Sequence, residues 1–208
     1  MVSLLAAVAA TVALAAGAAL AATVTGTDGP DTLVGTMKDD RIEALAGNDH
    51  LYGLNGPDTY RGGDGDDRLS ENLELGTPGA PAPPPGEGYT GKDVMYGEGG
   101  TDVLIGARSA DTLYGGPNNP DPSSTEALFG DTGDDTLKGG DGRDNLQGAG
   151  GRDRLLGGRG PGFLDAAFSE TVGTPDVVDC GAGTDTAVAN NNDTVKNCED
   201  VIRVANPS

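Results

Sequence analysis

Acidic residues recur at a fixed spacing along this chain, and carboxylates placed at a fixed spacing can bind cations. The first block has an aspartate at every ninth position, at Asp31, Asp40, Asp49, Asp58 and Asp67. After interruptions the spacing returns twice, with Asp93, Asp102 and Asp111, and then with Glu126, Asp135, Asp144 and Asp153. A weaker pair is Asp176 and Asp185. This regularity predicts an internal repeat that gathers cations as it folds.

Two further positions share the period of the acids. An apolar residue stands two positions after nearly every acid, as at Leu33, Ile42 and Leu51, and a glycine usually stands two positions before it, as at Gly29 and Gly47. The apolar residue predicts a very short strand that points one side chain inward. The glycines allow close backbone approach and positive φ, so that several carbonyl oxygens can face one centre. Carbonyls and carboxylates together suit calcium, which takes about six to eight oxygen ligands.

The nonapeptide Gly62–Ser70 fits the pattern G-G-x-G-x-D-x-U-x throughout, and Gly139–Gln147 fits it as well. Over roughly residues 26 to 188 the chain therefore resembles the hemolysin-type calcium-binding (RTX) repeats. The resemblance implies an all-β fold, a right-handed parallel β-roll (a β-solenoid) in which two nonapeptides form one turn. It also implies calcium ions between loops that are stacked one turn apart, so that every second repeat shares an edge.

The resemblance also implies which acids share an edge. Asp31, Asp49 and Asp67 would line one edge, and Asp40 and Asp58 the other. In the later blocks Asp93 and Asp111 would lie opposite Asp102, and Asp135 and Asp153 opposite Asp144. The other metal-site candidates lie in the same loops and are Gly62, Asp64, Gly65, Gly133, Gly139 and Asp141. Fewer ligands are expected near Lys38, Lys92 and Glu126, where the pattern departs from the consensus.

The chain is strongly acidic, with a formal net charge of -20. This charge argues against binding to nucleic acid and to anionic membrane surfaces, because both are polyanions. The alternative to a cation-loaded fold is a disordered, glycine-rich polyanion. A phased apolar residue favours the folded alternative, since disorder does not require one.

Residues 1–21 are predicted to be a signal peptide. An apolar run over Val2–Leu20 ends in small residues at a spacing that a signal peptidase accepts, and we expect cleavage after Ala21. An uncleaved transmembrane helix is the alternative, although the run is short and mostly alanine. Export would place the protein outside the cell.

Cys180 and Cys198 are the two cysteines of the chain, and an exported protein permits their oxidation. We therefore expect a disulfide, with two free thiols as the alternative. The disulfide would covalently link a C-terminal cap at residues 189–208 to the β-roll at residues 22–188. We expect loop insertions near residues 71–87, 116–123 and 161–173, the last with Phe163, Leu164 and Phe168 packed over the roll as a short helix or loop.

The sequence offers no constellation that indicates an enzyme. His50 is the single histidine and is expected on the surface, and motifs for zinc or serine hydrolases are missing. The expected function is that of a secreted calcium-binding repeat protein with a structural or binding role, whose folding is coupled to calcium capture. An extracellular matrix or cell-surface partner is compatible with this role. The alternative is an accessory fragment of an extracellular hydrolase or toxin whose catalytic domain lies outside this chain.

Overall fold

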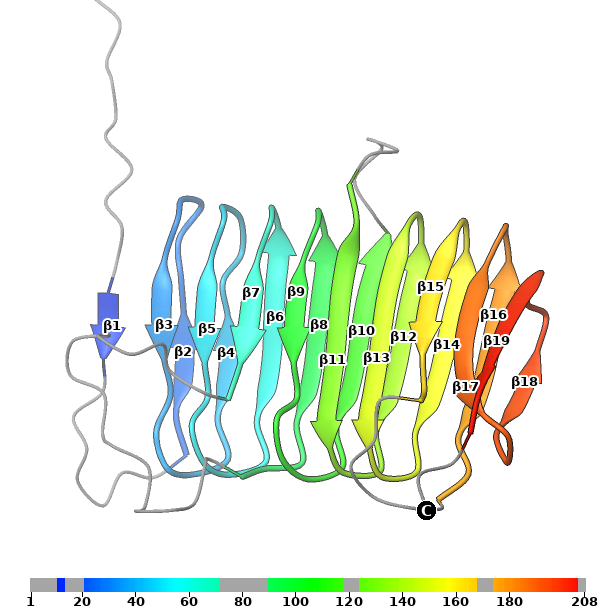
Figure 1. Cartoon of the computed structure of the whole chain (residues 1–208). Coiled ribbons are helices and arrows are strands. Elements are labelled where there is room, and N and C mark those ends of the chain that lie inside the picture. Colours follow the sequence, from blue (N-terminus) through cyan, green and yellow to red (C-terminus); the bar gives the residue numbers. More distant parts are fainter. Residues whose placement is uncertain (1–10, 14–20, 72–89, 118–123, 168–173, 206–208) are drawn as a thin grey trace, which may run out of the picture.

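The computed structural model describes residues 11–13, 21–71, 90–117, 124–167 and 174–205. The regular elements of these described residues are strands, with no helix among them. The strands stack along one axis into an elongated roll built from two sheets (Figure 1).

The odd-numbered strands form one sheet and the even-numbered strands form the other. The odd sheet contains β1 (Thr11–Ala13), β3 (Thr32–Val34), β5 (His50–Tyr52), β7 (Arg68–Ser70), β9 (Val103–Ile105), β11 (Glu126–Thr132), β13 (Asp144–Gly150), β15 (Gly162–Asp165), β17 (Thr186–Asn190) and β19 (Asp200–Val204). The even sheet contains β2 (Thr23–Thr25), β4 (Arg41–Glu43), β6 (Thr59–Asp64), β8 (Val94–Gly99), β10 (Thr112–Pro117), β12 (Thr136–Asp141), β14 (Arg154–Arg159), β16 (Val177–Ala182) and β18 (Thr194–Lys196).

Consecutive strands alternate between the two sheets, so one turn of the roll contributes one strand to each. All pairings are parallel, and equivalent repeat positions pair, as Leu33 does with Leu51. Where the repeat is interrupted, the register still holds, because Tyr60 of β6 pairs with Met95 of β8. The predicted parallel β-roll with two nonapeptides per turn is thus confirmed.

The core is a double row of side chains between the sheets. Most of its members are the apolar residues that stand two positions after an acid, and all of these are fully buried: Leu33, Ile42, Leu51, Tyr60, Leu69, Met95, Leu104, Leu113, Leu128, Leu137, Leu146, Leu155, Val178 and Ala187. Burying one such large side chain contributes roughly 1.5 to 3 kcal/mol. Each strand supplies few inward side chains, so the core is narrow.

The predicted insertion at 161–173 is wrong in its first part. Residues Gly162–Asp165 form β15, which lies between β13 and β17 in the odd sheet. Leu164 is buried in register with Leu146, whereas Phe163 is 42% exposed on the outer face. The repeat was hidden in the sequence because a glycine, Gly162, stands where the acid of this repeat would be. Phe168 lies outside the described residues.

The predicted insertion near 116–123 begins later than expected. Gly116 and Pro117 belong to β10 and pair with Gly140 and Asp141 of β12. Residues 118–123 lie outside the described part of the chain. In the predicted insertion near 71–87, Glu71 is described and buried, and the rest lies outside the described residues.

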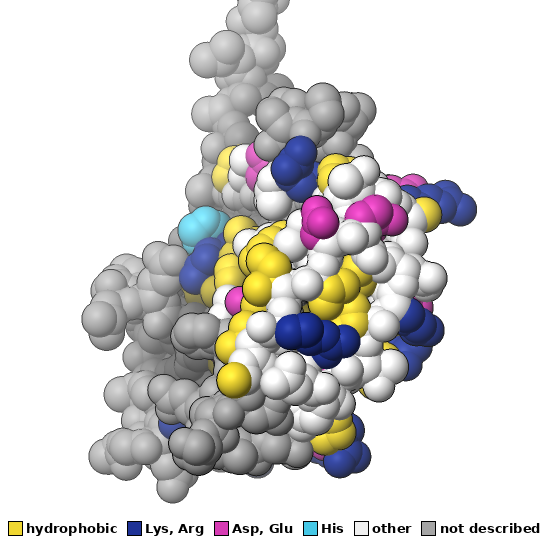
Figure 2. Space-filling model, turned by 45° about the vertical axis from the view of Figure 1, so that its right-hand side comes forward, with side chains coloured by type: hydrophobic (Ala, Val, Ile, Leu, Met, Phe, Trp, Pro, Cys, Tyr) yellow, Lys and Arg dark blue, Asp and Glu magenta, His cyan; other side chains and the backbone are white. Residues whose placement is uncertain are grey.

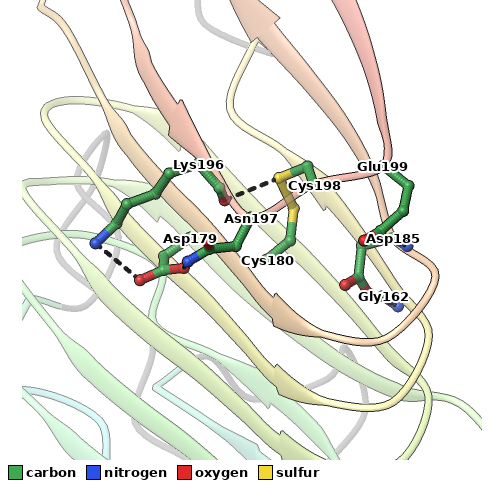
Figure 3. The surroundings of a disulfide bond; sticks show 8 residues. All are labelled: Gly162, Asp179, Cys180, Asp185, Lys196, Asn197, Cys198 and Glu199. Carbon is green, nitrogen blue, oxygen red and sulfur yellow. Dashed lines mark hydrogen bonds and ion pairs between the residues drawn. A yellow bond between two sulfur atoms is a disulfide. The ribbon is translucent and has the colours of Figure 1, made fainter.

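The C-terminal cap continues the roll as a last turn formed by β17, β18 and β19. The predicted disulfide is present and joins Cys180 of β16 to Cys198 in the loop between β18 and β19, with the Cα atoms 5.2 Å apart (Figure 3). Beside it, Lys196 forms an ion pair with Asp179 at 2.9 Å. Hydrophobic side chains gather at this end of the roll (Figure 2), where Val201 and Ile202 are 42% and 54% exposed.

At the N-terminal end, β1 lies within the predicted signal peptide. It pairs with β3 through Thr11 and Thr32. Among the described residues there is no helix with the length and apolar character needed to cross a membrane. Cleavage after Ala21 would remove β1 and leave β2 and β3 as the first turn.

Candidate metal-binding loops

The acids of the repeat form two columns along the roll, one on each edge. The odd column precedes the odd-numbered strands, and there the backbone N–H of Asp31 donates to Oδ1 of Asp49 at 2.7 Å. Asp49 donates in the same way to Asp67 at 2.9 Å. Each acid therefore accepts a hydrogen bond from the loop one turn before it, which locks neighbouring turns together.

The even column precedes the even-numbered strands and has the same geometry. Each backbone N–H donates to Oδ1 of the next acid at 2.7 to 2.9 Å along the series Asp40, Asp58, Asp93, Asp111, Asp135, Asp153, Asp176 and Asp193. Asp102 and Asp144 belong to the odd column. The predicted division of the acids between two edges is thus confirmed.

The second oxygen of most column acids is buried and has no hydrogen-bond partner. These unpartnered oxygens are Oδ2 of Asp49, Asp58, Asp67, Asp102, Asp111, Asp135, Asp153 and Asp185, and Oε2 of Glu126. A buried carboxylate oxygen without a partner is strongly destabilising unless a counter-charge compensates it. So many orphaned oxygens at one repeat position indicate a cationic ligand.

The electrostatics of the columns lead to the same conclusion. Burial raises the pKa of Asp58 to about 9, with the backbone N–H of Asp40 partly opposing the shift. It also raises the pKa of Asp111 to about 8 and that of Asp135 to about 7. Neighbouring acids of the same column raise these pKa values further. At neutral pH these carboxylates therefore need a positive charge nearby in order to stay ionised.

The first glycine of each nonapeptide borders the space beside the unpartnered oxygen. A Cβ atom at Gly62 would lie 2.3 Å from Oδ2 of Asp67 and 2.7 Å from the carbonyl oxygen of Gly97, one turn further on. At Gly139 the corresponding distances to Asp144 and Gly157 are 2.3 and 2.6 Å. A carboxylate oxygen and a carbonyl oxygen of adjacent turns thus face the same small space, and only glycine leaves it free.

The second loop glycine permits the turns to stack. Gly65 has a φ of +143°, and a Cβ atom there would lie 1.7 Å from the carbonyl oxygen of Gly47. Gly133 has a φ of +151° and makes the equivalent approach to Ser109. This close stacking brings the backbone carbonyls of successive loops together.

Carboxylates do not converge in groups within these loops. In the part of the chain that the structure describes, there is no cluster of three or more His, Cys, Asp or Glu residues that could hold a metal. A bound ion would therefore take its remaining ligands from backbone carbonyls, a donor set of hard oxygens that suits calcium and does not suit zinc.

Comparison with known families agrees with this donor set. The RTX calcium-binding nonapeptide repeat model matches residues 25–60, 34–69, 87–119 and 129–164, which together span more than half of the chain. The chain belongs to the RTX calcium-binding nonapeptide repeat family. No curated protein matches it.

Not all predicted site residues of this RTX chain lie in the columns. Asp64 and Asp141 are exposed at the ends of β6 and β12, and Asp141 forms a loose ion pair with Arg159 at 3.8 Å. Two other loop acids have a different role, since Oδ1 of Asp66 and of Asp134 accept backbone N–H bonds from the next turn. The structure therefore does not bring Asp64 and Asp141 to the buried acid positions.

The RTX columns extend beyond the predicted site. Glu126 occupies an odd-column position beside Asp144, and the N–H of Asp185 donates to Oε2 of Glu199 at 2.8 Å. Asp176 and Asp193 continue the even column. The spacing of Asp176 and Asp185 already indicated part of this extension, but Asp193 and Glu199 have no loop glycines to mark them.

One further acid of the RTX roll was not recognised from the sequence. Glu71 is fully buried directly after β7, where its carboxyl group lies beside that of Asp93. Burial and the nearby charges of Asp93 and Asp111 raise its pKa. Glu71 follows Asp67 by four positions and so lies outside the nine-residue spacing, which explains why the spacing did not predict its burial.

Proposed function

We propose that this protein is a secreted, non-enzymatic repeat module that binds calcium between its stacked loops and folds as it captures the ions. The observation that carries the proposal is the row of buried carboxylate oxygens without partners along both columns. A folded chain with these groups ionised and uncompensated would be destabilised at every turn.

The column acids would hold the ions together with backbone carbonyls of the loop glycines. Oδ2 of Asp67 and the carbonyl oxygen of Gly97 face one such space, and Oδ2 of Asp144 and the carbonyl oxygen of Gly157 face another. A bound calcium ion supplies two positive charges that compensate the buried carboxylates. Because the ligands come from different turns, the unfolded chain has no preformed site, and calcium binding energy becomes folding energy.

Secretion is supported by two features of the chain. The apolar N-terminal run with small residues before position 22 has the character of a signal peptide. The disulfide between Cys180 and Cys198 is of a kind that forms in oxidising compartments.

A structural or binding role is supported by the uniformity of the acids. Apart from Glu71, which lies beside Asp93, the buried carboxylates share one repeat position and one hydrogen-bond pattern, so none of the column acids is set apart as a general acid, a general base or a nucleophile. Enzymes instead distinguish their catalytic carboxylates by different environments.

Chelation and calcium titration test the proposal. Circular dichroism of the mature chain in EDTA should show little β-structure, and excess calcium should restore it, whereas magnesium at the same concentration should not. Calorimetric titration should give several ions per chain. A cooperative, protected β-structure under rigorous chelation would contradict calcium-coupled folding.

A further inference from the structure

The C-terminal end of the roll exposes apolar side chains on its last strand (Figure 2). Among the described residues, three of the five exposed large hydrophobic side chains lie on β19, namely Val201, Ile202 and Val204. Val201 pairs in register with the buried Ala187, so it occupies a core position, and yet it is 42% exposed. The apolar core therefore reaches the surface at this end of the roll.

The last strands also have an unpaired backbone edge. β18 ends the even sheet and β19 ends the odd sheet of the described residues. The N–H of Asp200 donates to the carbonyl oxygen of Asp185 at 3.0 Å, on the side of β17. On the other side of β19, no described strand pairs with it. An edge strand of this kind is a template for pairing with another chain.

The opposite end of the odd sheet already accepts an additional strand. There β1 pairs in parallel with β3, and Thr11 lies opposite Thr32. β1 lies within residues 1–21, which the predicted cleavage removes. β2 and β3 then become the first strands of the two sheets. The mature chain would therefore have one open edge pair at β2 and β3 and a second at β18 and β19.

These two ends are complementary in topology. The strands alternate between the even and the odd sheet along the chain, and all pairings are parallel. When β2 and β3 of a second copy follow β18 and β19, the alternation continues, and a shift along the roll axis extends both sheets. Two identical ends would instead meet with antiparallel strands.

The backbone hydrogen bond that such a junction needs can be named. Within the roll, the N–H of His50 donates to the carbonyl oxygen of Asp31, the acid one turn earlier, at 3.0 Å. Thr32 is the corresponding donor of β3, because it pairs in register with His50. Glu199 is the odd-column acid of the last turn. Its carbonyl oxygen is therefore the acceptor that Thr32 of a second copy would meet.

We propose that mature chains assemble head to tail, so that β2 and β3 of one copy continue the two sheets beyond β18 and β19 of another copy. Val201 would then lie beside the buried Leu33 of the second copy and continue the core across the junction. The inference rests on the signal-peptide cleavage that is part of the proposed function. A contact between two different ends leaves one end open at each side, so it produces open chains of copies.

The association should be weak and should depend on salt. β2 and β3 have three residues each, so the contact is small, and dissociation constants in the micromolar range, of about 10 to 100 µM, are expected. The copies also repel each other, because each carries a formal net charge of -20. Added salt screens this repulsion and should strengthen the assembly.

Sedimentation velocity of the mature chain in saturating calcium tests the proposal. Between about 1 µM and about 300 µM, the sedimentation coefficient should rise and pass beyond that of a dimer. Circular dichroism of the same samples verifies that the chain is folded. A folded chain that stays monomeric over the whole range overturns the proposal.

Two substitutions block one end each. Val201→Lys places a charge at the core position of the C-terminal end, which the single chain tolerates because this position is partly exposed. Thr32→Pro removes the backbone donor of the N-terminal end and keeps the bond from His50 to Asp31. Each variant should raise the dissociation constant about tenfold or more with unchanged circular dichroism in calcium. Phe163→Lys is the control, because Phe163 is also 42% exposed but lies on β15, away from both ends.

A mixture of the two variants distinguishes head-to-tail contacts from contacts between identical ends. Each variant keeps one intact end, so the mixture should form dimers, whereas each variant alone should not. Association of Thr32→Pro chains with one another, or a mixture that stays monomeric, would overturn the proposal. If a variant lost its calcium-dependent circular dichroism, the concentration series of the unmodified chain would still decide.

The test also separates this proposal from the proposed function. A chain that folds in calcium and stays monomeric would refute the assembly alone. A chain that folds equally well in EDTA would refute calcium-coupled folding, whether or not the copies assemble.

Discussion

The backbone N–H of Asp67 donates a 2.9 Å hydrogen bond to Oδ1 of Asp102, although the two residues lie 35 positions apart. The bond from Asp49 to Asp67 spans 18 positions and has the same length. The chain between Asp67 and Asp102 includes the interruption of the repeat, yet the odd column passes it unchanged. Contacts between turns, and not the continuity of the sequence, therefore define the column.

Replacing a column acid by its amide should have opposite effects with and without calcium. In Asp111→Asn the unfavourable buried charge disappears, so the calcium-free chain should become more stable, by about 1 kcal/mol or more. With calcium the variant loses a ligand charge, and it should bind fewer ions and unfold at a lower temperature. Circular dichroism in EDTA, where the variant should keep more β-structure than the parent chain, measures the first effect, and calorimetry and thermal unfolding in calcium measure the second. The exposed Asp28→Asn is the control and should change neither.

Stability without calcium should fall as the pH rises. Burial raises the pKa of Asp58 to about 9 and that of Asp102 to about 7, from the ordinary value of 3.8. The folded chain therefore holds more protons than the unfolded chain between pH values of about 4 and 9. The contribution of these protonated acids to the stability is fully present below about pH 4 and is lost as the pH rises to about 9. With calcium bound, protons compete with the ion, and the dependence should reverse. Circular dichroism at pH 4.5 and pH 8 without calcium, and urea unfolding at the same pH values with calcium, measure it, and an equal pH dependence in the two series would contradict it.

A methyl group at a stacked loop glycine should be far more destabilising than one at an open glycine. Gly65→Ala would place Cβ 1.7 Å from the carbonyl oxygen of Gly47, at a φ that alanine avoids, and should cost roughly 2 to 4 kcal/mol. At Gly99 the nearest atom is Oδ1 of the exposed Asp64 at 3.1 Å, so Gly99→Ala is the matched control. Denaturant unfolding in calcium compares them, and a similar loss in both variants would argue against tight stacking of the loops.

Loss of the disulfide should destabilise the C-terminal end. Cys180→Ser combined with Cys198→Ser opens a loop whose ends lie 18 positions apart, which should cost about 3 kcal/mol by the chain-entropy relation. The effect should be largest at the last turn, so hydrogen exchange at β18 and β19 is the most direct measurement. If the backbone amides of β18 and β19 stayed equally protected from exchange, the ion pair between Lys196 and Asp179 and the core contacts would be sufficient to hold the last turn without the disulfide.

Part of the candidate site could be predicted from spacing, because a solenoid repeats one local structure. The acid, the apolar residue and the glycine each keep their phase, and the structure places Asp31, Leu33 and Gly29 as that phase requires. Prediction from the spacing fails where the acid of a repeat is replaced by another residue. Gly162 gave no sign of β15, and Glu71, outside the nine-residue spacing, gave no sign of its burial between the turns.

The repeat, most of the strand positions, the inward side chains and the family resemblance could be predicted from the amino-acid sequence alone, because these depend on which residue types recur at short range. The contacts between the acids of successive turns could be read only from the folded chain. The pairing of Asp67 with Asp102 and the buried oxygens without partners arise where loops distant in sequence stack. The number of residues between those loops varies along the chain, whereas the hydrogen bonds between parallel strands fix the distance between the loops in space.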